Sequence, residues 1–190
     1  MKPSIRTKKN KTIKEEAYMG IDPGKTGAAC LYFPKTNQLA FFDYPSSGNE
    51  LDIVLAMELW KDLYDIKACL IEKVSAMPVM GVKNKAGKQT IQRQGITSTF
   101  TFGQNFGAWK MLITCLRIPM YLLTPPQWRK GLVTKKDGKD TKDQNYNVAI
   151  RLFPEGELNG KRGGRKSGRV DAALLAFRCY QDRRIINLKE

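Results

Sequence analysis

Three acidic residues in the sequence are placed where they could act together on a metal ion. Asp22 ends an apolar run and precedes a Pro-Gly turn, Glu72 ends a second apolar run, and Asp171 lies near the start of a segment rich in alanine and leucine. Carboxylate oxygens are the ligands that Mg²⁺ and Mn²⁺ prefer in proteins. Two such ions can activate a water and stabilise the departing oxygen in phosphodiester hydrolysis. The three acids therefore predict metal-dependent chemistry on a phosphate group.

Each acid also has an ordinary structural interpretation. Asp22 could cap a β-turn, Glu72 could be an exposed residue at a strand end, and Asp171 would suit the first turn of any helix electrostatically. Their combination favours function, because a strand-helix-strand crossover makes the first and fourth strands parallel neighbours. Two carboxylates at adjacent strand ends repel each other unless a cation joins them. The small Ala172 and Ala173 would let the last helix bring its acid close.

The chain contains no histidine, and its four cysteines, Cys30, Cys69, Cys115 and Cys179, lie far apart with no Cys-x-x-Cys pair. These facts exclude zinc fingers and histidine-dependent catalysis. The cysteines stand among apolar neighbours, which predicts reduced thiols in a core and, by default, a cytoplasmic location.

Charge points to the partner. Lysine and arginine total 33 against 18 aspartate and glutamate residues, a formal net charge of +15. A small domain with that surface repels itself unless a polyanion binds, so nucleic acid is the leading partner. Solubility or a basic tail alone is the alternative, but the tail through Lys14 holds only part of the excess.

The length of 190 residues predicts one domain, over 17–183, between a disordered basic tail at 1–16 and a C-terminal tail at 184–190. The N-terminal tail lacks the apolar stretch of a secretory signal. No apolar run approaches the roughly 18 residues of a membrane span, and we expect no membrane association.

Apolar periodicity and turn residues predict the elements that must position the acids. We expect strands at 17–22, 27–33 and 39–43, a helix at 49–64, a strand at 67–72, a helix at 98–116, a strand at 119–123, a helical turn at 125–131, and helices at 143–153 and 170–180. This order predicts an α/β, RNase H-like fold. Its central mixed sheet has five strands, three antiparallel and then parallel ones, with helices on both faces. A doubly wound nucleotide-binding fold would not begin with three hairpin-linked strands.

Two tryptophans are interpreted as core residues. Trp109 shares one side of the helix at 98–116 with Phe102, Phe106 and Ile113, while Gly103, Gly107 and Ala108 would allow close packing. Trp128, beside a Pro-Pro pair, is favoured as a core anchor over a residue that stacks on a base.

Several motifs together resemble the RuvC-type Holliday junction resolvases, especially the compact versions of phages and organelles. The matching segments are Gly20-Ile21-Asp22-Pro23-Gly24 with Gly27-Ala28, Ile71-Glu72-Lys73-Val74, Phe102-x-x-x-Phe106-Gly107, Pro125-x-x-Trp128-Arg129-Lys130, Lys142 before Ala149-x-x-Leu152-Phe153-Pro154, and Gly168 to Ala176. They span residues 18 to 180 in the family's order.

The resemblance implies a homodimer that grips a four-way DNA junction and nicks two opposed strands symmetrically. It implies that Asp22, Glu72 and Asp171 are catalytic metal ligands for Mg²⁺, for which Mn²⁺ would substitute, with no small-molecule cofactor. For a phage-encoded member the location would be the host cytoplasm.

One position departs from the family's pattern. A fourth acid, or a histidine, usually stands one turn before the last aspartate, where this chain has Lys166-Ser167-Gly168. Ser167 could hold a water on a second ion, an acid could come from elsewhere, or the site could be weakened or inactive.

Basic residues in two regions are candidates for phosphate contacts, which give salt-dependent affinity with little sequence information. They are Lys83, Lys85, Lys88 and Arg93 in a basic loop or short ragged element at 76–94, and Lys130, Lys135, Lys136, Lys142 and Arg169 nearer the acids. In the same loop, the apolar Met77, Pro78 and Met80 could wedge against unstacked bases or pack at a dimer interface.

Two other functions stay open beside junction cleavage. One is an RNase H-like nuclease acting on RNA-DNA hybrids or flaps. The other is a catalytically weakened protein that binds branched DNA.

Overall fold

The computed structural model describes residues 13–24, 26–44, 50–73, 80–83, 89–92, 96–160 and 163–186. Its strands are β1 (Glu15–Asp22), β2 (Ala28–Phe33), β3 (Gln38–Asp43), β4 (Tyr64–Glu72), β5 (Met80–Lys83), β6 (Gln89–Gln92) and β7 (Met120–Leu123). Its helices are α1 (Glu50–Leu63), α2 (Ile96–Cys115), α3 (Pro125–Arg129), the 3-10 turn η1 (Lys135–Asp137), α4 (Thr141–Leu152) and α5 (Ser167–Ile186).

The central sheet has five strands in the order β3-β2-β1-β4-β7. Both hairpin pairs, β1 with β2 and β2 with β3, are antiparallel, whereas β4 runs parallel to β1 and to β7. Helix α1 makes the first crossover and α2 the second, as parallel neighbours require. The predicted mixed sheet of three antiparallel and then parallel strands is confirmed.

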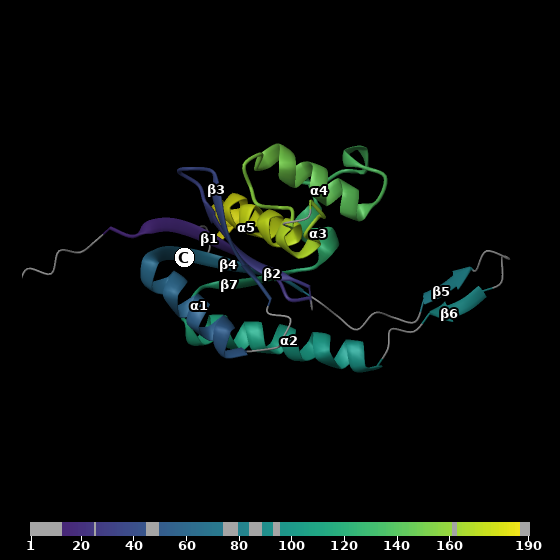
Figure 1. Ribbon diagram of the computed structural model, residues 1–190, viewed down its shortest axis with the longest axis horizontal. Coiled ribbons are helices and arrows are strands. Elements are labelled where there is room, and N and C mark those ends of the chain that lie inside the picture. The colour runs from purple at the N-terminus through teal and green to yellow at the C-terminus, as the bar shows by residue number, and fades with distance from the viewer. Residues whose placement is uncertain are drawn as a thin grey trace, which may run out of the picture.

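Helices cover both faces of the sheet, and each face has its own core (Figure 1). Alternate residues of β1 point to opposite faces, as in any strand. Tyr18 belongs to the core under α4 and α5, while Met19 and Ile21 belong to the core under α1 and α2. The predicted core positions of Trp109 and Trp128 are confirmed, with exposed fractions of 2% and 1%.

Helix α5 crosses β1 at very short range because glycine faces it there. A Cβ atom on Gly20 would lie 2.2 Å from the backbone of both Ala172 and Ala176, and one on Gly168 would lie 2.1 Å from the backbone oxygen of Thr26. Small residues on both elements thus let α5 pack at short distance on the sheet, as the sequence predicts for Ala172.

The two ends of the domain extend further than predicted. Strand β1 begins at Glu15 and α5 continues to Ile186, so regular structure reaches two residues before 17 and three residues past 183. Glu15 and Glu16 pair with Tyr64 and Asp65 of β4 through backbone groups, which need no apolar side chain. The remaining tail residues, 1–12 and 187–190, lie outside the described residues.

Helix α2 is less enclosed than its sequence predicts. Cys115 is exposed, whereas the other three cysteines are buried as predicted. It is the last residue of α2. Among the described residues, no atom lies within 4 Å of a Cβ atom placed on Gly103 or Gly107, so neither glycine serves close packing there.

The region expected to be a basic loop or short ragged element contains a regular hairpin. Strands β5 and β6 pair antiparallel from Met80 opposite Gln92 to Lys83 opposite Gln89, as a separate two-stranded sheet. Among the described residues no helix is long and apolar enough to cross a membrane.

Candidate active site

Two of the three predicted acids end adjacent parallel strands. Ile21 of β1 lies opposite Ile71 of β4, so the next residues, Asp22 and Glu72, stand side by side at the carboxyl edge of the sheet. Both isoleucines belong to the core under α1 and α2. Because strand side chains alternate, Asp22 and Glu72 face the opposite side, where α5 lies.

Asp171 approaches this edge from helix α5, on the side of the sheet that Asp22 and Glu72 face. Helix α5 begins at Ser167, so Asp171 stands one turn into the helix and not in its first turn. The favourable effect of the helix dipole on an acid falls off beyond the first turn. The structural interpretation of Asp171 as an N-terminal helix residue therefore loses its basis.

Each carboxylate accepts a hydrogen bond through one oxygen. The backbone N–H of Gly24 donates to Asp22 Oδ1 at 3.0 Å, and the indole Nε1 of Trp128 donates to Glu72 Oε2 at 3.0 Å. The amide Nδ2 of Asn145 donates to Asp171 Oδ1 at 2.7 Å. Among the described residues, the second oxygen of each acid has no hydrogen-bond donor.

The three acids influence one another electrostatically. The pKa of Glu72 is raised to about 7, mainly by burial and also by the negative charges of Asp22 and Asp171, against the Trp128 hydrogen bond that lowers it. Burial, and then the charge of Asp22, raises the pKa of Asp171 to about 6. Burial also raises the pKa of Asp22. Three negative charges are unfavourable in this shared environment, and a bound cation would reduce that cost.

The donor chemistry of these residues fits a hard cation such as Mg²⁺ or Mn²⁺, because it consists of carboxylate oxygens without nitrogen or sulfur. Within the part of the chain that the structure describes, however, no three Asp, Glu, Cys or His side chains already converge as a complete metal-binding group. The acids are thus electrically coupled neighbours, and binding an ion would require their free oxygens to turn toward it.

A buried polar bridge beside the acids was missed at the level of sequence. Asn145 is 4% exposed, and its Oδ1 accepts a hydrogen bond of 2.9 Å from Nε of Arg129. Arg129 also donates to Gln144 Oε1 at 2.8 Å. The positive charge of Arg129 lowers the pKa of both Glu72 and Asp171. The adjacent polar residues in the sequence Asp143-Gln144-Asn145 carry no signal that one of them is buried.

The start of α5, where a fourth acid would stand in the resolvases that the motifs resemble, carries an ion-pair cluster. Ser167 is the first residue of α5, and its neighbours Lys166 and Arg169 both pair with Asp43, at the end of β3. Nε of Arg169 lies 2.6 Å from Asp43 Oδ1. Asp43 pairs with Ala28, and Ala28 with Asp22, so an acid does stand in the same cross-strand row. Its charge is already compensated by two cations, which hold the pKa of Asp43 below its usual value despite burial.

The predicted DNA contacts fall into three groups. Lys130, Lys135, Lys136 and Lys142 are exposed, and Lys142 lies close enough to lower the pKa of Asp171. Arg169 is only 16% exposed at its side chain and is engaged with Asp43 and Glu157. Of the residues predicted in the loop, Lys83 and Met80 lie in β5 with side chains that are not described, and Lys85, Lys88, Arg93, Met77 and Pro78 lie outside the described residues.

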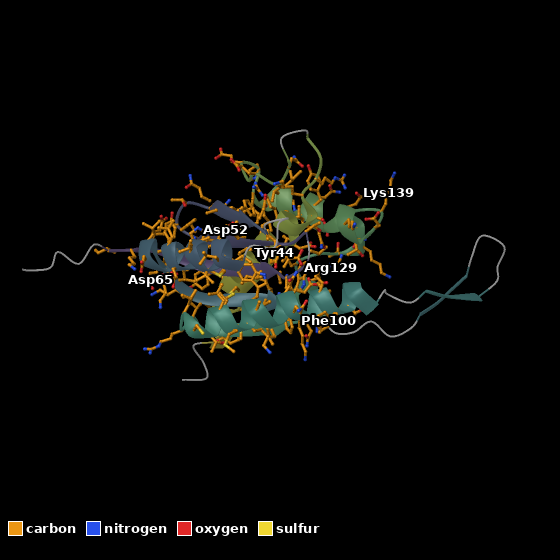
Figure 2. The ribbon with its side chains drawn as sticks, turned by 60° about the horizontal axis from the view of Figure 1, so that its bottom comes forward. Tyr44, Asp52, Asp65, Phe100, Arg129 and Lys139 are labelled. Carbon is orange, nitrogen blue, oxygen red and sulfur yellow. The ribbon has the colours of Figure 1, made fainter. Side chains whose placement is uncertain are left out.

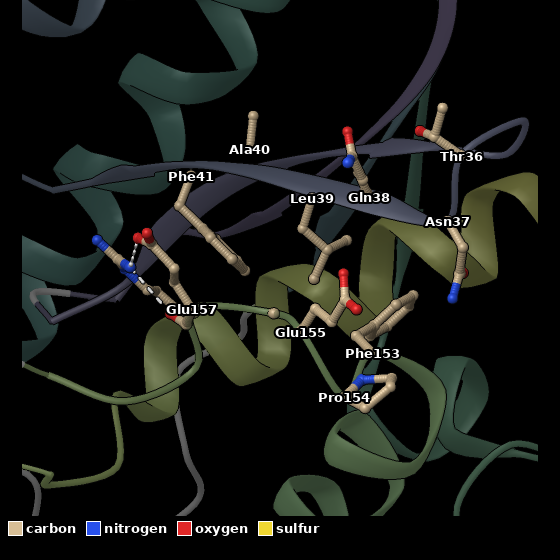
Figure 3. Close-up of a pocket in the computed structure, with 12 residues that line it drawn as sticks. Thr36, Asn37, Gln38, Leu39, Ala40, Phe41, Phe153, Pro154, Glu155 and Glu157 are labelled. Carbon is tan, nitrogen blue, oxygen red and sulfur yellow. Dashed lines mark hydrogen bonds and ion pairs between the residues drawn. The ribbon is translucent and has the colours of Figure 1, made fainter.

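One pocket in the described part of the chain lies away from the acids. It measures about 560 Å³ and lies between β3 and the segment after α4 (Figure 3). Leu39, Phe41 and Phe153 line it, with Glu157 and Arg169 at one end. Phe41 also lies under the Arg169 guanidinium, 5.1 Å from ring centre to Cζ. This pocket therefore borders the ion-pair cluster and not the candidate active site.

No protein-family model and no curated protein matches the sequence. Solved structures do match the fold. They include RuvC of Thermus thermophilus in complex with a Holliday junction substrate, and Thermus thermophilus RuvC. Each has a TM-score of 0.54 and 15% sequence identity, over 89% of this chain and 96% of that chain. The likeness shows a RuvC-like, RNase H-like fold over nearly the whole domain, as the resemblance of motifs predicts.

Proposed function

We propose that this protein is a structure-selective endonuclease that cleaves four-way DNA junctions by metal-dependent hydrolysis of phosphodiester bonds. The observation that carries the proposal is the gathering of Asp22, Glu72 and Asp171 at one edge of a RuvC-like sheet. None of these three mutually repelling carboxylates forms an ion pair among the described residues, and a bound cation would compensate their charge.

In this mechanism the three acids would hold Mg²⁺, with Mn²⁺ as a substitute. The metal supplies activation of a water and stabilisation of the departing 3′ oxygen. The chain's own residues orient the acids and receive the DNA. Lys142, near Asp171, and Arg129, near Asp171 and Glu72, put positive charge beside the place where a phosphate would lie.

The junction as substrate is supported by charge and by fold. The exposed Lys130, Lys135, Lys136 and Lys142 all lie on the segment from α3 to α4, on the α5 side of the sheet. One matching structure is a RuvC bound to a Holliday junction. A net charge of +15 gives the long-range attraction that a branched polyanion requires.

A homodimer, which paired nicks on opposed strands require, is supported by the outward face of α2. Phe100, labelled in Figure 2, is 66% exposed on this helix, and Met111 is 65% exposed. Between them, Gly103 and Gly107 leave open space. Large exposed apolar side chains beside small residues are typical of a surface that another helix covers.

The test is to incubate the purified protein and Mg²⁺ with a labelled four-way junction, a linear duplex, a flap and an RNA-DNA hybrid. We expect symmetric paired nicks on the junction alone. Cleavage of the hybrid or flap in preference to the junction would replace the proposal with a related nuclease activity. Junction binding without cleavage would identify a catalytically silent binding protein.

That silent protein is the second candidate, and one observation favours it. The position of the family's fourth acid is Ser167, and the nearest acid in the cross-strand row, Asp43, is engaged by two cations.

A further inference from the structure

We propose that Trp128 and Asn145 are positioning residues for the metal-binding carboxylates, and that Arg129 fixes the orientation of the Asn145 amide. The inference rests on the proposed function, because it assigns a role at that same site. All three residues come from α3 and α4, outside the three elements that carry the acids.

Trp128 fixes the position of one carboxylate oxygen of Glu72. The indole is 1% exposed, and its N–H donates to Glu72 Oε2 at 3.0 Å. An indole N–H is a donor only, so it can bind a carboxylate oxygen in one way. A glutamate side chain has three rotatable bonds, and this contact selects the rotamers in which Oε2 points toward α3. The other oxygen, Oε1, then has a restricted set of directions in which to meet an ion.

Asn145 orients the carboxylate of Asp171 in the same way, but its own amide must also be held in one orientation. An amide presents a donor on one side and an acceptor on the other, and only the donor side can bind a carboxylate. Arg129 Nε donates to the Asn145 oxygen at 2.9 Å, while Asn145 Nδ2 donates to Asp171 Oδ1 at 2.7 Å. Because arginine has no acceptor, it holds the amide with its oxygen away from Asp171. Loss of Arg129 would remove this selection.

The other buried tryptophan shows that the Trp128 contact is not a general demand of burial. Trp109, 2% exposed, has an indole N–H with no hydrogen-bond partner in the described structure. The fold therefore tolerates a buried indole that packs without a hydrogen-bond partner among the described residues. Trp128 packs equally well and in addition binds an acid of the site. Replacing each by phenylalanine removes similar packing from the two cores but a hydrogen bond from only one.

The experiment measures Mn²⁺ affinity by calorimetry or electron paramagnetic resonance on the full chain without DNA. We expect Trp128→Phe and Asn145→Ala each to weaken Mn²⁺ binding by about 10- to 100-fold, the range for loss of outer-shell partners of metal ligands. Trp109→Phe and Asn147→Ala are the matched controls. Asn147 lies on the same helix as Asn145 and donates to the backbone oxygen of Asp137, away from the acids. Both controls should stay within about twofold of wild type.

The outcomes separate the positioning role from the proposed function. Weak Mn²⁺ binding by Trp128→Phe, with a circular dichroism spectrum and melting behaviour like those of Trp109→Phe, supports the positioning role. Equal affinities in both variants overturn it and leave the nuclease proposal standing. Absence of Mn²⁺ binding in the wild-type protein overturns both. If Asn145→Ala does not fold, Arg129→Met serves instead, because it removes the orienting donor from a partly exposed position.

Discussion

At the scale of single residues, the acids differ in how the chain holds them. Asp22 is held by the backbone of its own turn through Gly24, whereas Glu72 and Asp171 depend on side chains from α3 and α4. A substitution at Asp22 therefore changes the charge of the site with little effect on its scaffold. Substitutions at the other two acids also leave a buried donor without its acceptor, which costs stability.

This difference makes Asp22→Asn the cleanest test of catalysis. Asparagine keeps the oxygen that accepts from Gly24 but removes a negative charge and most of the metal affinity. We expect cleavage to fall by more than about 100-fold, beyond the loss typical of outer-shell partners. Junction binding should be unchanged or tighter, since a charge that repels phosphate is gone. Nicking assays and gel-shift titrations measure the two effects, and full activity in this variant would contradict the site assignment.

The raised pKa values predict an unusual dependence of stability on pH. Both Glu72, with a pKa of about 7, and Asp171, with a pKa of about 6, bind a proton more tightly in the folded than in the unfolded chain. The metal-free protein should therefore lose stability, by an amount on the order of a few kcal/mol, as pH rises from about 4 to about 7. Asp43, whose pKa is lowered, acts in the opposite sense only below about pH 4.

Added Mg²⁺ should reverse this loss, because it binds the ionised acids. We expect Mg²⁺ to raise the melting temperature clearly at about pH 8 and hardly at all at about pH 5. Thermal melts in EDTA and in Mg²⁺ across this range are the measurement. Glu72→Gln should flatten the pH dependence of the EDTA series. A metal-free stability that increases steadily across the window would show that the three acids are not coupled.

At the scale of elements, the contact between β1 and α5 sets the distance between Asp22 and Asp171. Gly20→Ala would place a methyl group 2.2 Å from the backbone of Ala172 and Ala176, which must move away. Overpacking costs about 1–3 kcal/mol, and backbone clashes lie at the upper end. We expect a fall in melting temperature of about 2–4 °C per kcal/mol, together with weaker Mn²⁺ binding. Gly164→Ala, whose added methyl group would meet no atom of the described residues within 4 Å, is the control and should change neither quantity.

The sequence predicts those parts of the fold and of the site that leave a local pattern along the chain. Asp22 and Glu72 could be paired because apolar runs mark β1 and β4, and the crossover rule makes these strands neighbours. The Asn145 bridge could not be found, because it depends on how α4 packs on α5. No periodicity reports that contact. The sequence misleads at Cys115 for a related reason, since apolar neighbours do not show which side of a helix end faces solvent.

At the scale of the whole molecule, the net charge of +15 predicts that DNA binding depends strongly on salt. A protein that neutralises several phosphates releases the same number of counterions, so its affinity falls linearly on a logarithmic scale, with a slope of about −0.9 per phosphate. We expect junction affinity to fall by orders of magnitude between about 50 mM and about 200 mM salt. Lys142→Ala, at an exposed position, should reduce the slope by about one. A flat salt response would contradict the role given to the lysines.

Two coordinated nicks on opposed strands would require two active sites, so paired cleavage should depend on assembly of two copies. If α2 covers its counterpart in a second copy, a charge placed at Met111, 65% exposed, would be buried without a partner and would disfavour the dimer. We expect Met111→Glu to be monomeric by sedimentation equilibrium, with a normal circular dichroism spectrum and with paired nicking lost. Ile150→Glu is the matched control, since Ile150 is 39% exposed on α4, in the opposite layer. A dimer that survives Met111→Glu but not Ile150→Glu would place the interface on the α4 side, where it would compete with the lysines for DNA.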